Sequence, residues 1–290
     1  MKASAPGKVI LFGEHAVVYG RHAVVTAINL RCYAEALKSS TFRIESPIAT
    51  TSLDFEKHPY VSYAIKRFME VKPIDGVKIK IESEIPIASG LGSSAAVTVA
   101  VLKALDAEFD AGLSDEELFE LARKVELDVQ GRGSGTDPFV STYGGAWLIP
   151  ERKPLDLGEF RMLIVNSGEE SITSEMVAKV ARLRDELGDV VERIFDVIDT
   201  ISLKAFAGEG EISRLMAVNQ CMLKAIGVST KRIDEIVEEL EGLGIAAKIT
   251  GAGGGGSVVG VGSDEALQRA AKLFSGIIVE PEREGARVED

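Results

Sequence analysis

An apolar run that follows a glycine-rich turn constrains the fold more than any other stretch of the chain. Residues 86–101 read PIASGLGSSAAVTVAV, and apolar residues continue to Leu105 with little polar interruption. The run is too short to span a bilayer and too apolar for a helix that keeps one face in water. We therefore predict a core helix that begins at this turn, with Ser93 or Ser94 as its N-cap.

The glycines before this helix allow two interpretations. Gly90 and Gly92 leave the backbone free of side chains, so N–H groups at the positive end of the helix dipole can approach a phosphate. A plain strand-to-helix turn capped by serine also favours glycine and serine. The stretch has neither the lysine of a P-loop nor the spacing of the dinucleotide-binding motif, so this loop alone does not decide between them.

Composition limits the class of partner. The chain has 290 residues, 46% of them hydrophobic and 27% charged, which suits one large domain or two smaller ones. A net charge of −12 argues against nucleic acid or an anionic membrane as the main partner. Cys32 and Cys221 are too few for a disulfide framework or a cysteine metal site. With no signal peptide or membrane anchor in view, these features predict a soluble cytoplasmic protein.

The order of strand and helix patterns predicts a mixed α/β chain in two parts. Strand-like runs dominate the first eighty residues, and the core helix and a second helix follow. This second helix begins with a capping box, Ser114 to Glu117. The polar segment ERKPLDLGEF after Pro150 marks a soft boundary, which separates predicted domains 1–155 and 156–290.

Three charged residues near turns have both a structural and a functional interpretation. Lys8, at the head of a predicted strand, is either a solvated turn lysine or a fixed positive charge for an anion. Glu126 projects beside the apolar stripe of the second helix, where it either stays at the rim or reaches a divalent cation bound to phosphates. Asp137, in GSGTDP, either shapes a turn or accepts a proton from a hydroxyl.

A second glycine run lies near the end of the chain. The stretch KITGAGGGGSVVGVG has four consecutive glycines, Gly253 to Gly256, between two strand-like runs. They form either a tight hairpin between packed strands or a place where a ligand approaches the backbone. Two glycine loops, each flanked by apolar elements, favour an anion site more than either loop does alone.

Three blocks in this order, PGKVILFGEHAVVYG, PIASGLGSSAAV and KITGAGGGG, resemble the GHMP superfamily of small-molecule kinases over most of the chain. The first block is similar to that of mevalonate kinases, whereas galactokinases show arginine in place of Lys8 and GEHTDY in place of GEHAVVYG. The resemblance implies an α/β (α+β) fold. It has an N-terminal α/β domain with a left-handed βαβ unit and a C-terminal ferredoxin-like domain, and ATP and mevalonate bind between them.

The same resemblance implies a role for particular residues. Asp137 would be the catalytic base with Lys8 beside it, and Ser94 and Glu126 would hold Mg²⁺. Residues implied to wrap the ATP triphosphate are Pro86, Ile87, Ala88, Ser89, Gly90, Leu91, Gly92, Ser93, Ser94, Ala95 and Ala96. Residues implied to line the mevalonate site are Glu14, His15, Ser134, Thr173 and Gly253.

Two alternatives stay open at this point. The chain is either a mevalonate kinase or another GHMP kinase, for phosphomevalonate, a sugar or homoserine. The second alternative is a non-catalytic sensor with the same fold. Lys8, Ser94, Glu126 and Asp137 together argue against the sensor, because a sensor needs no base. The partners implied are small molecules, without nucleic acid or membrane, and a homodimer is compatible with the resemblance.

Overall fold

The computed structural model describes residues 1–86, 89–131, 133–158 and 160–289. The first part of the chain contains, in order, β1 (Lys2–Phe12), η1 (Ala16–Tyr19), β2 (Ala23–Lys38), β3 (Arg43–Glu45), β4 (Thr50–Thr51), α1 (Pro59–Val71), β5 (Val77–Ser83), α2 (Ser93–Phe109), α3 (Asp115–Gln130), α4 (Thr136–Tyr143), β6 (Ala146–Ile149) and β7 (Lys153–Leu155).

The rest of the chain contains a second set of elements. They are β8 (Met162–Asn166), α5 (Thr173–Leu187), α6 (Asp189–Phe206), α7 (Ile212–Ala225), α8 (Lys231–Gly242), β9 (Ala246–Thr250), β10 (Ser257–Val261), α9 (Asp264–Phe274), β11 (Ile277–Val279) and β12 (Arg287–Glu289). The predicted boundary near residue 155 falls between β7 and β8.

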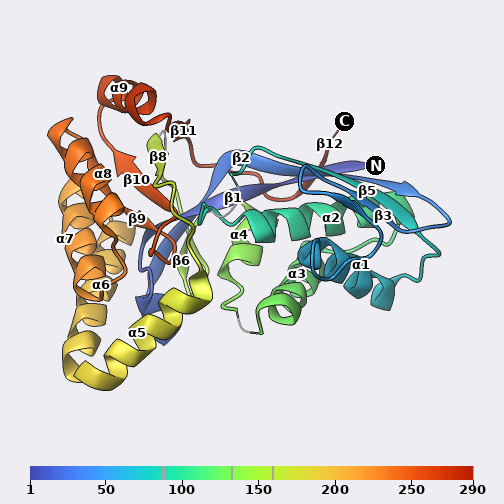
Figure 1. Ribbon diagram of the computed structural model, residues 1–290, viewed down its shortest axis with the longest axis horizontal. Helices are drawn as coiled ribbons and strands as arrows, with labels where there is room; N and C mark the ends of the chain where they lie inside the picture. Colours follow the sequence, from blue (N-terminus) through green and yellow to red (C-terminus); the bar gives the residue numbers. More distant parts are fainter. Residues whose placement is uncertain (87–88, 132, 159, 290) are drawn as a thin grey trace.

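The first sheet has the order β12-β1-β2-β5-β3-β4, with β6 paired to β2 and β7 to β6. Its pairs are antiparallel except β3 with β5, which the crossover through α1 makes parallel. Helices α1 to α4 lie together on one side of this sheet (Figure 1). The last strand, β12, pairs with β1, so the end of the chain returns to the first sheet although the sequence assigned residues 156–290 to the second domain.

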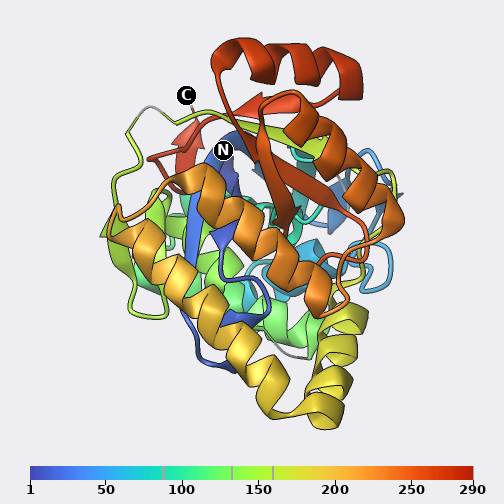
Figure 2. The same cartoon turned by 90° about the vertical axis from the view of Figure 1, so that its left-hand side faces the viewer.

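The second sheet has the order β11-β8-β10-β9, and its described pairs are antiparallel. Helices connect β8 to β9 and β10 to β11, which is the ferredoxin-like arrangement implied by the sequence. Helices α5 to α8 gather at the end of the molecule away from α1, and they lie in front when the molecule is viewed from that end (Figure 2). Most of their buried apolar residues form a second core, while Ile201 of α6 and Met216 of α7 join the main core of the first sheet.

The predicted core helix is α2, and its central residues from Ala95 to Leu105 are nearly all buried. Its alanines and valines are small enough for it to pack against β1, β2, α1 and α3. The predicted serine N-cap is wrong. Gly92, with a left-handed φ of 73°, is the N-cap, and Ser93 and Ser94 are the first two helical residues. A hydroxyl inside the helix is past the position from which it can accept the first-turn N–H groups.

The capping box predicted for the next helix is confirmed. The Ser114 hydroxyl accepts from the backbone N–H of Glu117, and the Glu117 carboxylate accepts from the backbone N–H of Ser114. This start fixes the register of α3 and so places Glu126 on its inner side. Within the part of the chain that the structure describes, none of the helices is long and apolar enough to cross a membrane.

Candidate active site

Lys8 and Asp137 form the centre of the site. Lys8 lies on β1, where it is 4% exposed, and its Nζ is 3.3 Å from Oδ1 of Asp137. Asp137 belongs to the first turn of α4, which follows Gly135 in a left-handed conformation. The Ser141 hydroxyl of α4 donates to the carbonyl of Pro6, 2.9 Å away, so helix and strand are attached close to the ion pair. The solvated-lysine interpretation of Lys8 is therefore wrong.

Glu126 of α3 reaches the same place. Its Oε2 accepts from the backbone N–H of Gly135 at 3.1 Å. Burial, and then the charge of Asp137, raise the pKa of the Glu126 carboxyl to about 7. Two carboxylates and one ammonium therefore converge here, with more negative than positive charge. Such a cluster is suited to a further cation.

The residues present fit a magnesium ion that is held mainly by phosphates. Ser94, in the first turn of α2, and Glu126 line one small cavity, together with Tyr60, Ala95, Thr98, Ala122, Gln130 and Pro138. Among the residues that the structure describes, no group of three or more His, Cys, Asp or Glu side chains could hold a metal alone. Mg²⁺ bound to nucleotides commonly takes only one or two protein oxygens and keeps several waters.

The predicted phosphate loop lies directly beside Lys8. The backbone N–H of Lys8 donates to the carbonyl of Leu91, 2.9 Å away. Gly90 and Gly92 both have positive φ, and a Cβ on Gly92 would lie 2.8 Å from Cγ of Lys8. The Ser89 hydroxyl donates to the carbonyl of Pro86 and is buried. Ile87 and Ala88, also predicted to bind ATP, lie outside the described residues.

The start of α2 has the chemistry of an anion site. Among the described residues, no side chain accepts a capping hydrogen bond at the N-terminus of α2, because its N-cap is Gly92. Ala95 and Ala96 follow in the next positions and are buried against the protein. The helix dipole adds partial positive charge at this end. The loop therefore offers backbone donors and Lys8 next to a carboxylate pair.

The second glycine loop is a hairpin that closes against the first. Residues 251–256 connect β9 to β10, and Thr250 pairs with Ser257. A Cβ on Gly90 would lie 3.2 Å from the Thr250 carbonyl, and one on Gly251 would lie 3.4 Å from the Gly90 carbonyl. Both residues have positive φ, 78° and 92°, which favours glycine at each, and the two backbones lie close together as the hairpin interpretation predicts. The approach joins the phosphate loop to the second sheet.

Gly253 is held from two sides within this hairpin. The Ser171 hydroxyl donates to the Gly253 carbonyl at 2.7 Å, and a Cβ on Gly253 would lie 2.3 Å from the Val228 carbonyl. Thr173, two residues past Ser171, is the first residue of α5 and is exposed. Ser134 is also exposed, and its hydroxyl donates to the Thr136 hydroxyl just before Asp137.

His15 and Glu14 point in different directions. The His15 Nε2 lies 2.8 Å from the Ala252 carbonyl, and burial lowers the pKa of the imidazole, so the neutral ring donates from Nε2. Glu14 instead forms a fully buried ion pair with Lys248 and accepts from the Asn219 amide at 3.3 Å. Burial raises the pKa of Glu14 and lowers that of Lys248. The Glu14 carboxylate is therefore occupied by Lys248 and Asn219.

Sequence reasoning did not identify Lys248, Asn219 or Thr250 as part of this region. Thr250 exchanges hydrogen bonds with the backbone of Ile10 through its hydroxyl, at 3.1 and 3.2 Å, and so attaches β9 to β1. One signal was available, since Lys248 is the only charged residue in the apolar strand AAKIT. A lysine in a buried strand needs a carboxylate partner.

The comparisons with known proteins agree with this geometry. The family models for the N terminal domain and the C terminal domain of GHMP kinases match residues 59–145 and 202–274. The mevalonate kinase of Archaeoglobus fulgidus is 55% identical over 292 residues, which cover 100% of both chains. The chain belongs to the mevalonate kinases of the GHMP family. The implied enzyme class and fold of this kinase are therefore confirmed.

Solved structures give the same result for the kinase as a whole. The mevalonate kinase of Methanococcus jannaschii superposes with a TM-score of 0.84 at 31% identity, over 100% of this chain and 98% of that one. The L. major mevalonate kinase in complex with R-mevalonate also gives a TM-score of 0.84, at 25% identity, over 98% and 97% of the chains.

Proposed function

We propose that this kinase transfers the γ-phosphoryl group of ATP to the primary hydroxyl of mevalonate. The observation that carries the proposal is the ion pair between Lys8 and Asp137, whose charged atoms are 3.3 Å apart. This pair lies near the N-terminus of α2, where no side-chain cap is present among the described residues. A phosphoryl group held at this helix end would lie beside both charges. Its mevalonate kinase relatives support mevalonate as the acceptor.

Asp137 acts on the attacking hydroxyl, and Lys8 acts on the transferred phosphoryl group. The Asp137 carboxylate orients the attacking hydroxyl and accepts its proton as the bond to phosphorus forms. Lys8 pairs with this carboxylate at 3.3 Å and places a positive charge next to the transferred group. Because the transition state of phosphoryl transfer is loose, positioning and charge supply most of the rate increase.

Residues 86–96 bind the triphosphate through the backbone of the phosphate loop and the first turn of α2. Ser94 and Glu126 would hold Mg²⁺, which would neutralise part of the phosphate charge. Burial and the charge of Asp137 raise the pKa of the Glu126 carboxyl to about 7, and this carboxyl would have to be ionised to act as a ligand. His15, Ser134, Thr173 and Gly253 line the mevalonate side, whereas Glu14, which the resemblance also assigns to this site, is paired with the buried Lys248.

A cytoplasmic location and a homodimer stay predictions. The first rests on the sequence features named above. The second is tested by light scattering of the purified kinase, because a homodimer would scatter with twice the mass of the 31.0 kDa chain.

The experiment that tests the function is a substrate panel with coupled detection of ADP. We expect mevalonate to support ADP formation far better than galactose, homoserine or phosphomevalonate. Equal or faster turnover with any of the other three would overturn the assignment to mevalonate. No ATP turnover with the whole panel, from protein that unfolds cooperatively, would instead support a sensor with this fold.

A further inference from the structure

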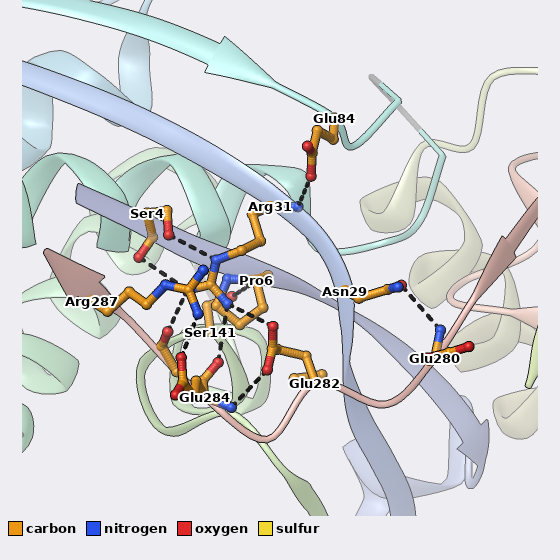
Figure 3. A network of polar contacts seen from close by, with 12 residues as sticks. Ser4, Pro6, Asn29, Arg31, Glu84, Ser141, Glu280, Glu282, Glu284 and Arg287 are labelled. Atoms are coloured by element: carbon orange, nitrogen blue, oxygen red, sulfur yellow. Dashed lines mark hydrogen bonds and ion pairs between the residues drawn. The ribbon is translucent and has the colours of Figure 1, made fainter. Parts of the chain in front are cut away.

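The last segment of the chain crosses back to the first sheet and lies beside β1 and β2 (Figure 3). Asn29 of β2 holds this segment at its start, since its backbone N–H donates to the Glu280 carbonyl and its side chain accepts from the Glu280 N–H, both at 3.0 Å. The Glu282 N–H then donates to the Ala27 carbonyl at 2.9 Å. β12 completes the crossing by pairing with β1.

Arg31 of β2 is the centre of the polar network beneath this segment (Figure 3). Its guanidinium is almost fully buried and donates to five acceptors. These are the Ser4 hydroxyl (2.7 Å), the Glu282 carboxylate (3.2 Å) and the carbonyls of Glu284 (3.2 Å), Gly285 (2.5 Å) and Ser4 (3.4 Å). Most of these acceptors belong to residues 282–285. A planar fork with five N–H donors can satisfy all of them, whereas an ammonium group cannot.

The segment that Arg31 holds is also the C-terminal cap of α4. The Ala286 N–H donates to the Thr142 carbonyl at 3.0 Å, and the Gly145 N–H donates to the Glu282 carbonyl at 2.8 Å. A Cβ on Gly285 would lie 1.9 Å from the Thr142 carbonyl oxygen, so the two backbones are in close contact. Carbonyls in the last turn of a helix have no partner within the helix, and residues 282–286 supply one from far along the chain.

Helix α4 carries Asp137 in its first turn and is only 8 residues long. A helix of this length has little stability of its own, so its position depends on its contacts. Its buried Phe139 and Val140 pack against the core. Two hydrogen bonds attach its C-terminal half to distant segments, the Ser141 hydroxyl on the Pro6 carbonyl and the cap at Thr142. A shift of the capped end would move Asp137 relative to Lys8.

We infer that Arg31 is a positioning residue for the Lys8–Asp137 pair, and that it acts through residues 282–286, which cap α4. The inference rests on the proposed role of Asp137 as base. Loss of the guanidinium removes the three bonds from Arg31 to residues 282–285, so the segment that supports α4 at the end opposite Asp137 is held less firmly. Because a misplacement of about 1 Å can cost roughly 100-fold in rate, the effect should appear in kcat.

The first test compares Arg31→Met and Arg31→Lys with Arg161→Met in the full-length kinase. Arg161 is exposed and also binds this segment, through the Glu280 carboxylate, so it is a matched control. We expect kcat to fall about 10- to 100-fold in Arg31→Met and less in Arg31→Lys, with KM for ATP nearly unchanged. Arg161→Met should keep kcat. Wild-type kcat in Arg31→Met, with a lower unfolding midpoint only, would overturn the inference.

The second test asks whether Arg31 acts through Asp137. In an Asp137→Asn background, Arg31→Met should lower kcat by less than about 3-fold, because there is no base left to misplace. A full, multiplicative loss would show that Arg31 acts elsewhere and would overturn the inference. If Asp137→Asn alone keeps kcat, the proposed base is wrong, which is a separate outcome from failure of Arg31→Met alone.

Gly285→Ala keeps the test decisive if Arg31→Met does not fold. The added methyl group would collide with the Thr142 carbonyl and push residues 282–286 away from α4 while Arg31 is intact. We expect a fall in kcat of about 10-fold that again disappears in the Asp137→Asn background. Unchanged kcat in folded Gly285→Ala would exclude the cap as a means of positioning Asp137.

Discussion

At the residue scale, the chemistry depends on how three charged side chains share a small volume. Lys8 comes from a strand, Glu126 from the inner side of α3 and Asp137 from the first turn of α4. The ammonium of Lys8 is 3.3 Å from Asp137, while Glu126 is bonded only to a backbone N–H among its described contacts. Asp137 is thus paired for catalysis, and Glu126 is available for a cation.

Asp137→Asn should lower kcat while the variant stays folded. Asparagine keeps the size of the side chain and suits the first turn of a helix, but it cannot accept a proton from the substrate hydroxyl. We expect kcat to fall about 10²–10⁴-fold, with a much smaller change in KM for ATP. Measuring kcat and the unfolding midpoint on one preparation checks this. A stable variant that keeps most of its activity would remove Asp137 from the mechanism.

Glu126 should make the metal-free kinase less stable as pH rises. Burial and Asp137 raise the pKa of its carboxyl from 4.5 to about 7, so the folded chain holds the proton more tightly than the unfolded chain. This stabilisation is complete below the unfolded value and is lost as pH rises through the folded one. In EDTA, we expect the unfolding midpoint to fall between about pH 5 and about pH 8, and Glu126→Gln to reduce that fall. Equal pH profiles would show that Glu126 is not the group responsible.

At the element scale, α2 begins without a side-chain cap among the described residues, and its N-terminus lies close to Lys8 of β1. Gly92 has φ 73° and faces the side chain of Lys8, whereas Gly112 has almost the same φ, 72°, with open space around it. The two glycines therefore differ in their surroundings and not in their backbone conformation.

Gly92→Ala and Gly112→Ala should differ in their effect on ATP binding. Both variants force alanine into the left-handed region, which costs about 1–2 kcal/mol of stability. Only the methyl group on residue 92 displaces Lys8 and the phosphate loop, so we expect KM for ATP to rise about 10-fold in that variant alone. Steady-state kinetics with varied ATP provide the measurement. An equal KM for ATP in both variants would show that the loop at Gly92 does not bind the nucleotide.

At the scale of the whole molecule, the site exists where the two sheets meet. The Thr250 hydroxyl attaches β9 to β1, His15 binds the Ala252 carbonyl, and the buried Glu14–Lys248 pair lies beneath them. A buried ion pair contributes little net stability but is costly to break, because removal of one partner leaves a charge without compensation. The stability of the contact between the two sheets is therefore sensitive to single substitutions.

Lys248→Met and Glu14→Gln should each cost about 3–5 kcal/mol in unfolding free energy, and the double variant should cost less than their sum. Lys80→Met is the exposed control. It breaks the pair with Glu82, whose side chain is 57% exposed, and should leave the unfolding free energy almost unchanged. Urea unfolding of the four variants gives these values. Additive losses would show that Glu14 and Lys248 do not stabilise each other.

Several elements of this kinase follow from the sequence because their causes are local. The apolar run to Leu105 predicts a core helix, and Ser114 with Glu117 predicts the start of α3. Both rest on contacts within a few residues, so neighbours along the chain suffice. The serine N-cap failed because Gly92, in a left-handed conformation, ends the phosphate loop one residue earlier. Sequence motifs also named Lys8, Glu126 and Asp137 through family resemblance.

Only the tertiary structure decides which of these residues meet. The Lys8–Asp137 distance, the pairing of Glu14 with Lys248 and the cap that residues 282–286 place on α4 join positions separated by more than a hundred residues. Such contacts depend on how sheets pack and strands pair, which a local pattern does not contain. Glu14 and His15 are adjacent in the sequence, yet they contact different segments. Glu14 is fully buried against Lys248 and His15 binds the Ala252 carbonyl, because the packing of the two sheets brings a different neighbour to each side chain.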